Sequence, residues 1–402
     1  MKKQALQDVD LKGKRVIVRV DFNVPLDGNG RITDDARITK TIPTIQYLID
    51  QNAKVILMSH LGRPDGKVAA KYSLKPVAEH LTKLLNKKVE LQSDCVGQAV
   101  QQRVKMLKPG EVILLENLRF HSEEEKNDAG FSKQLAALAD IYVNDAFGTA
   151  HRAHASTEGI AHHLPSVAGF LLAKEIEYFD KALKNPKRPF TTILGGAKVS
   201  DKIKVIENLL TKVDSLLIGG AMAYTFLKAG GHKTGKSKID EPGVPIAASV
   251  MKKAKERNVE LLLPVDHVVS QEVSEQAQTK VSGLEIADGW IGVDIGPKTI
   301  LLFQETLKKS KTIVWNGPVG IFEMKPFENG TKKIAETLAE LSATTIIGGG
   351  DTAAAIAQFG LEDKMSHVST GGGASLEYLE GTVLPGIKIL TDQKMSKVPS
   401  SG

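Results

Sequence analysis

The sequence predicts an α/β protein with two doubly wound lobes, each with a mainly parallel sheet flanked by helices. Short runs of β-branched and aliphatic residues alternate with helical patterns along the chain, which is typical of parallel sheets. The alternation breaks at residues 185–189, where two prolines flank a basic pair, and then starts again. A length of 402 residues suits two or three domains. We therefore expect one lobe over residues 1–170, a linker helix over 171–185 and a second lobe over 186–390.

Composition places the chain among ordinary globular proteins. Hydrophobic residues make up 42% and charged residues 25%. The single cysteine, Cys95, excludes an internal disulfide and suits a reducing compartment. No segment approaches the roughly 18 apolar residues that span a bilayer, so we expect a cytoplasmic protein without a membrane partner. The net charge of +6 is dispersed among acids and aromatics are only 5%, which argues against nucleic acid and favours small anions.

In the first half, each expected strand runs directly into polar or ionisable residues. Strands are expected at 15–20, 54–58, 111–115 and 141–143, and a helical pattern begins at Ile42, after Arg37. Asp21, Asn23, His60, Arg63, Arg119 and Arg152 follow these strands. Each arginine alone is most simply a surface ion-pair partner. As a set with Arg37 they indicate an anionic substrate, because a planar guanidinium suits phosphate and carboxylate oxygens.

In the second half, strands are expected at 191–194, 215–218, 260–264, 313–315 and 344–347, with helices at 200–210 and 221–228. The strand at 344–347 runs into Gly348-Gly349-Gly350-Asp351-Thr352 and then an alanine-rich helix. Such a junction points unpaired N–H groups and the positive end of a helix dipole at one place, which predicts a phosphate site. Asp351 is either the N-cap of that helix or a ligand for Mg²⁺ on a bound nucleotide.

Similar glycine turns recur at Gly195-Gly196, Gly219-Gly220 and residues 371–373. One such turn is weak evidence, since glycines also simply permit tight turns. Several can converge on one crevice at the carboxyl ends of parallel strands. Lys198 and Lys202, four residues apart, would share a helix face after the first turn and hold migrating phosphate oxygens, unless they form a solvated basic face.

A P-loop-like segment, the histidines and Glu323 are further candidates for binding chemistry. Residues 230–237 match the P-loop pattern G-x-x-x-x-G-K-S, but the preceding segment is helical, so we expect a solvated loop. The histidines lack metal-binding spacing, and His60 is better read as a hydrogen-bond donor to an anion. Glu323, which follows an apolar loop, could accept a hydrogen bond from a ribose hydroxyl.

Together these motifs resemble those of the phosphoglycerate kinase family. The resemblance covers essentially the whole chain and is carried by residues 19–25, 59–64, 116–120, 144–154, 195–202 and 315–320. It implies a phosphoglycerate-binding first lobe, to which residues 391–402 return, and a nucleotide-binding second lobe. It further implies a monomer with Mg²⁺ as cofactor.

The implied reaction is reversible transfer of the acyl phosphate of 1,3-bisphosphoglycerate to MgADP, giving 3-phosphoglycerate and MgATP in glycolysis and gluconeogenesis. Transfer would be direct and in line, with the lobes closing. A nucleotide-dependent kinase for another small carboxylate is the alternative.

The resemblance also assigns residues to roles. Catalytic residues would be Arg37, Lys198, Gly349 and Gly372. Substrate would be bound by Asp21, Phe22, Asn23, Arg37, His60, Leu61, Gly62, Arg63, Arg119 and Arg152. Nucleotide would be bound by Gly195, Lys198, Lys202, Gly219, Gly292, Gly296, Asn316, Pro318, Glu323, Gly349, Gly350, Asp351 and Thr352, with Asp351 contacting Mg²⁺ through the nucleotide.

Overall fold

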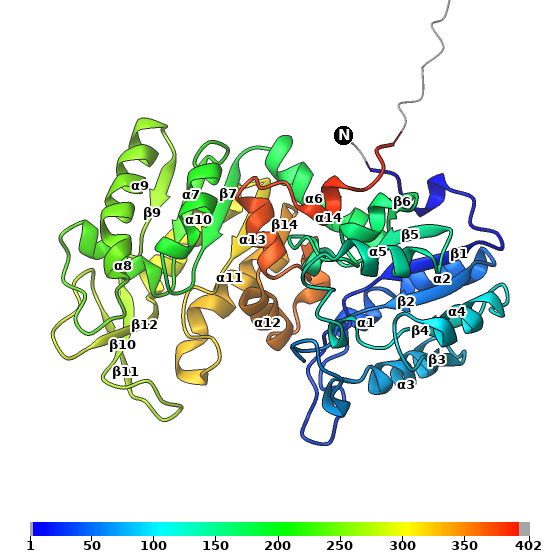
Figure 1. The fold of residues 1–402 in the computed structure, drawn as a ribbon. Coiled ribbons are helices and arrows are strands. Elements are labelled where there is room, and N and C mark those ends of the chain that lie inside the picture. Colours follow the sequence, from blue (N-terminus) through cyan, green and yellow to red (C-terminus); the bar gives the residue numbers. More distant parts are fainter. Residues whose placement is uncertain (1–2, 394–402) are drawn as a thin grey trace, which may run out of the picture. The chain divides into compact units, whose positions relative to one another are not determined.

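The computed structural model describes residues 3–393, and over this range the chain forms two compact units (Figure 1). The first unit runs to Ile176 and resumes at Val383, and the second is Glu177–Thr382. Within the first unit, Lys3 forms an antiparallel bridge with Asp392, and its Nζ lies 2.8 Å from that carboxylate. Of the expected C-terminal return, residues 394–402 lie outside the described part.

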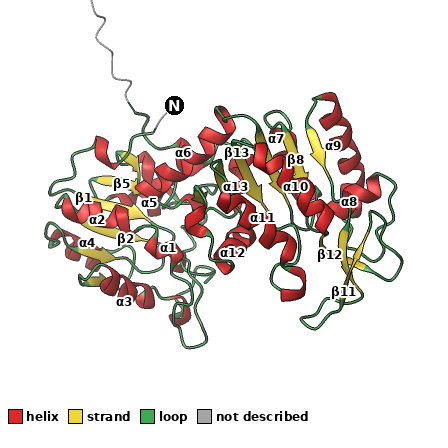
Figure 2. Cartoon of the chain, turned by 180° about the vertical axis from the view of Figure 1, so that it is seen from behind, coloured by secondary structure: helices red, strands yellow, loops and turns green. Residues whose placement is uncertain are grey.

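The first unit is built on a parallel sheet with helices packed against it (Figure 2). Its strand order is β3-β4-β2-β1-β5-β6, and every pairing is parallel. The inner strands are buried along nearly their whole length, which explains their continuous apolar sequence. The strands are β1 (Arg15–Arg19), β2 (Lys54–Met58), β3 (Val89–Leu91), β4 (Val112–Leu114), β5 (Ile141–Asn144) and β6 (Ser166–Ala168). The helices are α1 (Ala36–Thr39), α2 (Ile42–Asp50), α3 (Lys75–Leu84), α4 (Gln98–Lys105), α5 (Ala129–Ala136) and α14 (Pro385–Lys388).

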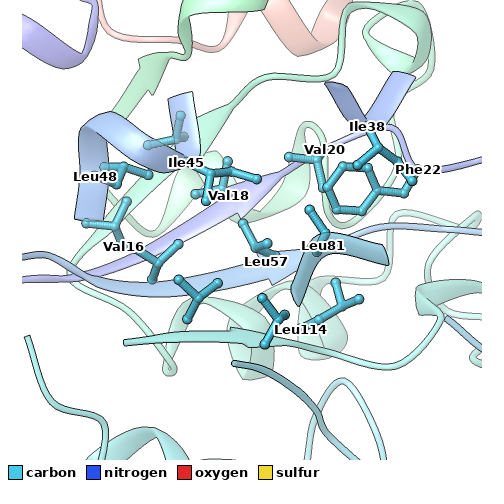
Figure 3. Close-up of a cluster of buried hydrophobic side chains, with 14 of the residues drawn as sticks. Val16, Val18, Val20, Phe22, Ile38, Ile45, Leu48, Leu57, Leu81 and Leu114 are labelled. Carbon is cyan, nitrogen blue, oxygen red and sulfur yellow. The ribbon is translucent and has the colours of Figure 1, made fainter. Parts of the chain in front are cut away.

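The core of the first unit joins this sheet to the helices on one of its faces. Val16 and Val18 of β1, Leu57 of β2, Ile45 of α2 and Leu81 of α3 meet there, and all five are fully buried (Figure 3). Alternate residues of β1 share the face that α2 and α3 cover, as the period of a strand requires. Helix packing on this face fixes the carboxyl ends of the strands, where the expected site residues lie.

Helix α3 offers an internal test of this core. Leu81 is 0% exposed and Leu84, one turn later, is 40% exposed. We expect Leu81→Ala to lower the free energy of unfolding by about 2–5 kcal/mol, because it removes a buried side chain and leaves a cavity. The matched control Leu84→Ala should change it by less than about 1 kcal/mol. Urea titration followed by circular dichroism measures both, and equal losses would contradict this packing.

Helix α6 (Phe170–Lys184) begins in the first unit and is held there by a buried carboxylate. Asp145 is 0% exposed, and its Oδ1 accepts hydrogen bonds from the Leu171 and Leu172 N–H groups at 2.9 and 3.2 Å. The same carboxylate fills the space where Gly169 would carry a Cβ. Burial raises the pKa of Asp145 to about 7, although Thr44 and the two amides oppose the rise.

The Asp145 shift predicts a pH dependence of stability. The folded protein holds this proton to a higher pH than the unfolded chain, whose Asp pKa is about 3.9. Its stabilising contribution is therefore complete below about pH 4 and is lost as pH rises through about 7. Between pH 4.5 and 7.5, the wild type should lose free energy of unfolding relative to Asp145→Asn in urea titrations. Asp140 has a lowered pKa beside Arg15, so Asp140→Asn should stay level over this range. If the difference in free energy of unfolding between the wild type and Asp145→Asn did not change between pH 4.5 and 7.5, the prediction would be contradicted.

The second unit repeats the parallel arrangement and adds a small antiparallel sheet. Its main sheet has the order β15-β14-β13-β7-β8-β9 with parallel pairings throughout. Its strands are β7 (Phe190–Leu194), β8 (Ser215–Ile218), β9 (Glu260–Leu262), β13 (Thr312–Asn316), β14 (Thr344–Gly348) and β15 (His367–Val368). The helices are α7 (Ile203–Leu209), α8 (Met222–Ala229), α9 (Val244–Glu256), α10 (Pro297–Lys309), α11 (Asn329–Glu340), α12 (Gly350–Gln358) and α13 (Gly373–Leu379).

The two parallel sheets confirm the predicted α/β class. The antiparallel sheet was not predicted: it pairs β10 (His267–Ser270) with β11 (Thr279–Ser282) and β12 (Ile291–Ile295). Over residues 3–393, no helix is both long and apolar enough to cross a bilayer.

Candidate active site

Strand order locates a potential ligand crevice in each unit. In the first sheet β1 lies between β2 and β5, and in the second β7 lies between β8 and β13. The chain reverses its direction of winding at these central strands, and ligands of open parallel sheets bind beside the carboxyl ends of strands at such points. Asp21 and His60 follow β1 and β2 in the first sheet, and Gly195 follows β7 in the second.

A cavity of about 330 Å³ lies at the switch point of the second unit. Such a volume falls within the range of small-molecule sites. Three of the four predicted turns contribute glycines to it, and Gly317 after β13 adds another. The Gly219-Gly220 turn instead packs on Val319, to whose carbonyl Gly220 donates at 2.9 Å. The lining residues are Gly196, Ala197, Lys198, Asp201, Lys202, Asn316, Gly317, Gly349, Gly350, Asp351, Thr352, Gly372, Gly373 and Leu376.

The N-terminus of α12 opens into this cavity. Its N-cap is Gly349, whose φ of +87° suits glycine, so the alternative that Asp351 caps the helix is wrong. Asp351 lies in the first turn with an exposed side chain, and the Thr352 hydroxyl accepts a hydrogen bond from Gly317 N–H at 2.7 Å. Free amides and a helix dipole at this point suit a phosphate group.

Lys198 and Lys202 line the cavity but do not share a helix face. A 3₁₀ turn begins only at Ser200 and α7 at Ile203, so Lys198 lies in the loop before the helix and the prediction of a common face is wrong. Lys198 is exposed. Lys202 Nζ donates to Gly195 O at 2.7 Å and to Asn316 O and Oδ1 at 3.2 and 2.9 Å. Burial lowers the pKa of Lys202 to about 8, and the charge of Asp351 partly offsets this.

The other residues expected to bind nucleotide lie outside the lining of this cavity. Gly195 approaches the backbone of Gly317 and Pro318 so closely that a Cβ would overlap the Pro318 carbonyl, and Gly219 packs on Val319. Gly292 of β12 faces the Tyr224 ring, and Gly296 faces the Asp266 carboxylate, which accepts from the first amides of α10. Glu323 is exposed in the loop after β13.

In the first unit, Arg37 meets the polar residues that follow β1. Its Nη1 donates to both Asp21 oxygens at 3.1 and 3.2 Å and to the Asn23 carbonyl at 3.1 Å. Asn23 Oδ1 accepts from the Gly62 N–H at 2.8 Å, which ties the loops after β1 and β2 together. Phe22 is fully buried, and its N–H donates to the Ser59 hydroxyl. Gly62 has a φ of +63° and faces the Tyr72 ring.

Arg119 and Arg37 lie near His60, and Arg152 lies near His154. Arg119 Nη1 donates to the Gly62 carbonyl at 2.9 Å, and Arg152 Nε contacts His151 Nε2 at 3.2 Å. Burial and the charges of Arg19, Arg119 and Arg37 hold the pKa of His60 well below its usual range, so this imidazole is neutral. Arg63 is exposed, and no contact described within residues 3–393 links it to the others.

Sequence reasoning missed two buried residues that organise this cluster. Asn117 accepts from Leu61 N–H and Arg119 N–H at 3.3 and 3.0 Å and donates to Leu61 O and Tyr72 O. Arg19 is 1% exposed and lies 3.2 Å from His60. The sequence did offer a signal for Arg19, which is a charged residue inside an otherwise apolar strand. Such a group is rarely buried without partners, so its position indicates a buried polar cluster.

Two alternative sites receive little support from their geometry. Residues 230–237 follow α8 and lead to no helix until the short turn at Glu241–Gly243, so they lack the strand and helix that a P-loop needs. The carboxylate of Asp94, the thiol of Cys95 and the ring of His121 lie within 4.8 Å of one another. His121 is already bonded to Asp94 at 2.7 Å, and burial raises the Cys95 thiol pKa, which opposes the thiolate that binds metals.

Comparison with known proteins decides the family. The family model described as phosphoglycerate kinase matches residues 6–382. The chain belongs to the phosphoglycerate kinase family. As a family member, it is a kinase that transfers phosphate between 1,3-bisphosphoglycerate and ADP, and the alternative of another small carboxylate as acceptor is not favoured.

Named relatives agree over nearly the full chain. Phosphoglycerate kinase of Dictyoglomus turgidum is 59% identical over 390 residues, which is 96% of this chain and 98% of the relative. That of Pseudothermotoga lettingae is 56% identical over 396 residues, which is 98% of this chain and 100% of the relative. The structure of phosphoglycerate kinase from Coxiella burnetii aligns with a TM-score of 0.89 at 46% identity, covering 96% of this chain and 98% of that one.

Proposed function

We propose that the two crevices divide the substrates of this phosphoglycerate kinase between them. The first unit binds 3-phosphoglycerate or 1,3-bisphosphoglycerate through Asp21, Asn23, His60 and four arginines, namely Arg37, Arg63, Arg119 and Arg152. The second unit binds ADP or ATP in the glycine-rich cavity. The observation that carries this proposal is that arginines gather at one switch point and free amides with lysines at the other.

The chemistry needs alignment and positive charge rather than a general base. An oxygen of the terminal phosphate of ADP attacks the phosphorus of the acyl phosphate, and the bond to the carboxylate oxygen breaks in the same step. Both the attacking and leaving oxygens are already deprotonated, so no proton has to move. Arg37 from the first unit and Lys198 from the second neutralise the equatorial oxygens of the phosphoryl group in flight. Amides near Gly349 and Gly372 stabilise the nucleotide phosphates.

The role proposed for Lys202 differs from that of Lys198. Its ammonium group is bound by three oxygens of Gly195 and Asn316, so it fixes the floor of the cavity and adds positive charge beneath the nucleotide phosphates. Lys198 has an exposed side chain in a loop and can follow the phosphoryl group. Lys202 therefore serves nucleotide binding, and Lys198 serves the transfer of the phosphoryl group.

The cavity fits a nucleotide that carries Mg²⁺. One exposed carboxylate, Asp351, stands in the first turn of α12 beside the amide cradle. Magnesium in nucleotide sites is usually held by one or two carboxylates together with phosphate oxygens and water, so this single carboxylate suits it. When bound, the ion neutralises phosphate charge during transfer.

Closure of the lobes, a monomeric state and a cytoplasmic location complete the proposal. Acyl phosphates hydrolyse readily, so water has to be excluded while the phosphoryl group moves. Binding both substrates should therefore draw the two units together. The radius of gyration from solution scattering should fall when 3-phosphoglycerate and an unreactive Mg-nucleotide are both present, and an unchanged radius would count against closure.

The test of substrate choice is an ATP-coupled assay with three carboxylates. We expect turnover with 3-phosphoglycerate and Mg²⁺, and a fall of at least about 10³-fold in kcat/KM with glycerate, which lacks the distal phosphate that the arginines would bind. Acetate should show still less. Similar rates with glycerate and 3-phosphoglycerate would show that the arginine cluster does not select the phosphate.

A further inference from the structure

A buried chain of polar side chains connects Glu124 to His60. Glu124 and Ser156 are 0% exposed, Arg19 is 1% exposed and His60 is 5% exposed. Ser156 Oγ lies 2.5 Å from Glu124 Oε1 and 2.8 Å from Arg19 Nε, and Arg19 Nη2 lies 3.2 Å from His60 Nδ1. The remaining Glu124 oxygen accepts from Ser156 N–H at 2.9 Å, and Arg19 Nη1 donates to the Val20 carbonyl.

Chemistry gives this chain a single direction of hydrogen bonding. A guanidinium can only donate, so Arg19 Nε donates to Ser156 Oγ and Arg19 Nη2 donates to His60 Nδ1. The one hydroxyl hydrogen of Ser156 is then free for Glu124 Oε1, which as a carboxylate can only accept. His60 Nδ1 must therefore be unprotonated, and the ring hydrogen must sit on Nε2.

We propose that Glu124, Ser156 and Arg19 are positioning residues that hold His60 in its neutral Nε2–H tautomer, ready to donate that hydrogen to an oxygen of the bound phosphoglycerate. The inference rests on the proposed role of His60 in substrate binding. Within residues 3–393, His60 Nε2 makes no hydrogen bond, so its hydrogen is available to a ligand.

The electrostatic setting agrees with this assignment. The positive charges nearest His60 belong to Arg19, Arg119 and Arg37, with His154 also close, and all of them oppose a second proton on the ring. Burial raises the pKa of Glu124, and the charge of Arg19 and the two Ser156 hydrogen bonds oppose the rise. Glu124 thus supplies the counter-charge that allows Arg19 to lie in the core.

A purely structural role is the competing explanation, and Tyr142 provides the matched control. Its buried hydroxyl donates to the Ser156 carbonyl at 2.9 Å and to the Thr157 carbonyl at 3.2 Å. Tyr142 therefore stabilises the same loop by binding the loop's backbone carbonyls, and it takes no part in the hydrogen bonds that connect Glu124 to His60. If Ser156 merely stabilises the loop, Tyr142→Phe and Ser156→Ala should have the same effects.

The experiment is long-range ¹H–¹⁵N correlation NMR on the full chain labelled with ¹⁵N-histidine, recorded between pH 5 and 8, with His60→Gln used to assign the signals. In the wild type and in Tyr142→Phe, we expect His60 to show an unprotonated Nδ1 and a protonated Nε2 across this range. In Ser156→Ala, we expect a mixture of tautomers. Arg19→Lys keeps the positive charge but loses the planar guanidinium that joins Ser156 to His60, so it should show the same mixture of His60 tautomers.

Steady-state kinetics then separate this inference from the proposed function. Ser156→Ala should raise the KM for 3-phosphoglycerate by about tenfold, with the KM for ATP within about twofold and a smaller change in kcat, because a hydrogen bond to a charged ligand is weakened. A protonated Nδ1 in the wild type, or a wild-type spectrum from both Ser156→Ala and Arg19→Lys, would overturn the positioning chain. A changed tautomer with an unchanged KM would instead overturn the role of His60 in substrate binding.

Discussion

Replacing Arg37 with alanine should lower kcat by about 10³-fold, since an arginine that neutralises a phosphoryl group in transfer contributes roughly 10³ to 10⁵ in rate. Arg37 Nη1 contacts Asp21 and the Asn23 carbonyl in this structure, and 38% of its side chain is exposed, so its guanidinium can reach a ligand. Arg37→Lys should recover only a small part of the rate, because lysine keeps the charge but lacks the planar fork.

The control for Arg37 is an arginine outside the site. Arg103 of α4, in the same unit, pairs with Glu90 at 3.1 Å and with Glu111 at 3.6 Å. Arg103→Ala should leave kcat within about twofold, because its side chain pairs with Glu90 and Glu111 and not with residues expected to bind substrate. Single-turnover measurement of phosphoryl transfer from ATP checks both variants. Equal kcat values for Arg37→Ala and the wild type would remove Arg37 from the transfer step.

The second large effect should come from Lys198, and Lys202 is its natural comparison. We expect Lys198→Ala to lower kcat by about 10² to 10³-fold, the usual loss when one group that stabilises transition-state charge is removed. Its affinity for ADP should change by less than about fivefold, because the amide cradle remains. Its free energy of unfolding should stay near that of the wild type, because the Lys198 side chain is exposed.

Lys202→Ala should behave differently in both respects. It leaves the oxygens of Gly195 and Asn316 without their donor, so the free energy of unfolding should fall by about 1–3 kcal/mol and ADP affinity should fall as well. Calorimetric titration with ADP and urea unfolding of both variants measure the contrast. If the two lysines lost affinity and stability equally, the division between binding and transfer would be wrong.

Much of the fold could be predicted because buried parallel strands have a strong sequence pattern. Lys54–Met58 and Ser215–Ile218 were predicted to the residue, since each is an apolar run that ends at polar or glycine residues. The antiparallel sheet was missed because β11 is largely exposed and carries Thr279, Lys280 and Ser282, which resemble a loop. Its stability comes from pairing with β10, which a local pattern does not reveal.

The candidate site was predictable where its residues follow the end of a strand. It was less predictable where it depends on buried residues that are far apart in the sequence. The glycine turns directly follow apolar runs, and Arg63 and Arg119 lie a few residues beyond such runs, so these positions could be read directly. The helix predicted to carry Lys198 begins later, because Gly196 has a φ of +100° and the chain needs several residues to leave that turn. The chain from Glu124 to His60 joins residues far apart in sequence, and only the folded structure brings them together.

The most direct test of one substrate per unit is a crystal structure of the chain with 3-phosphoglycerate and a non-hydrolysable Mg-nucleotide. We predict that the phosphate and carboxylate of the acid lie against Arg119, Arg152 and His60, and that the nucleotide phosphates lie against the amides near Gly349 and Gly372. Both ligands in the glycine-rich cavity, or an acid bound away from the arginines, would contradict this assignment.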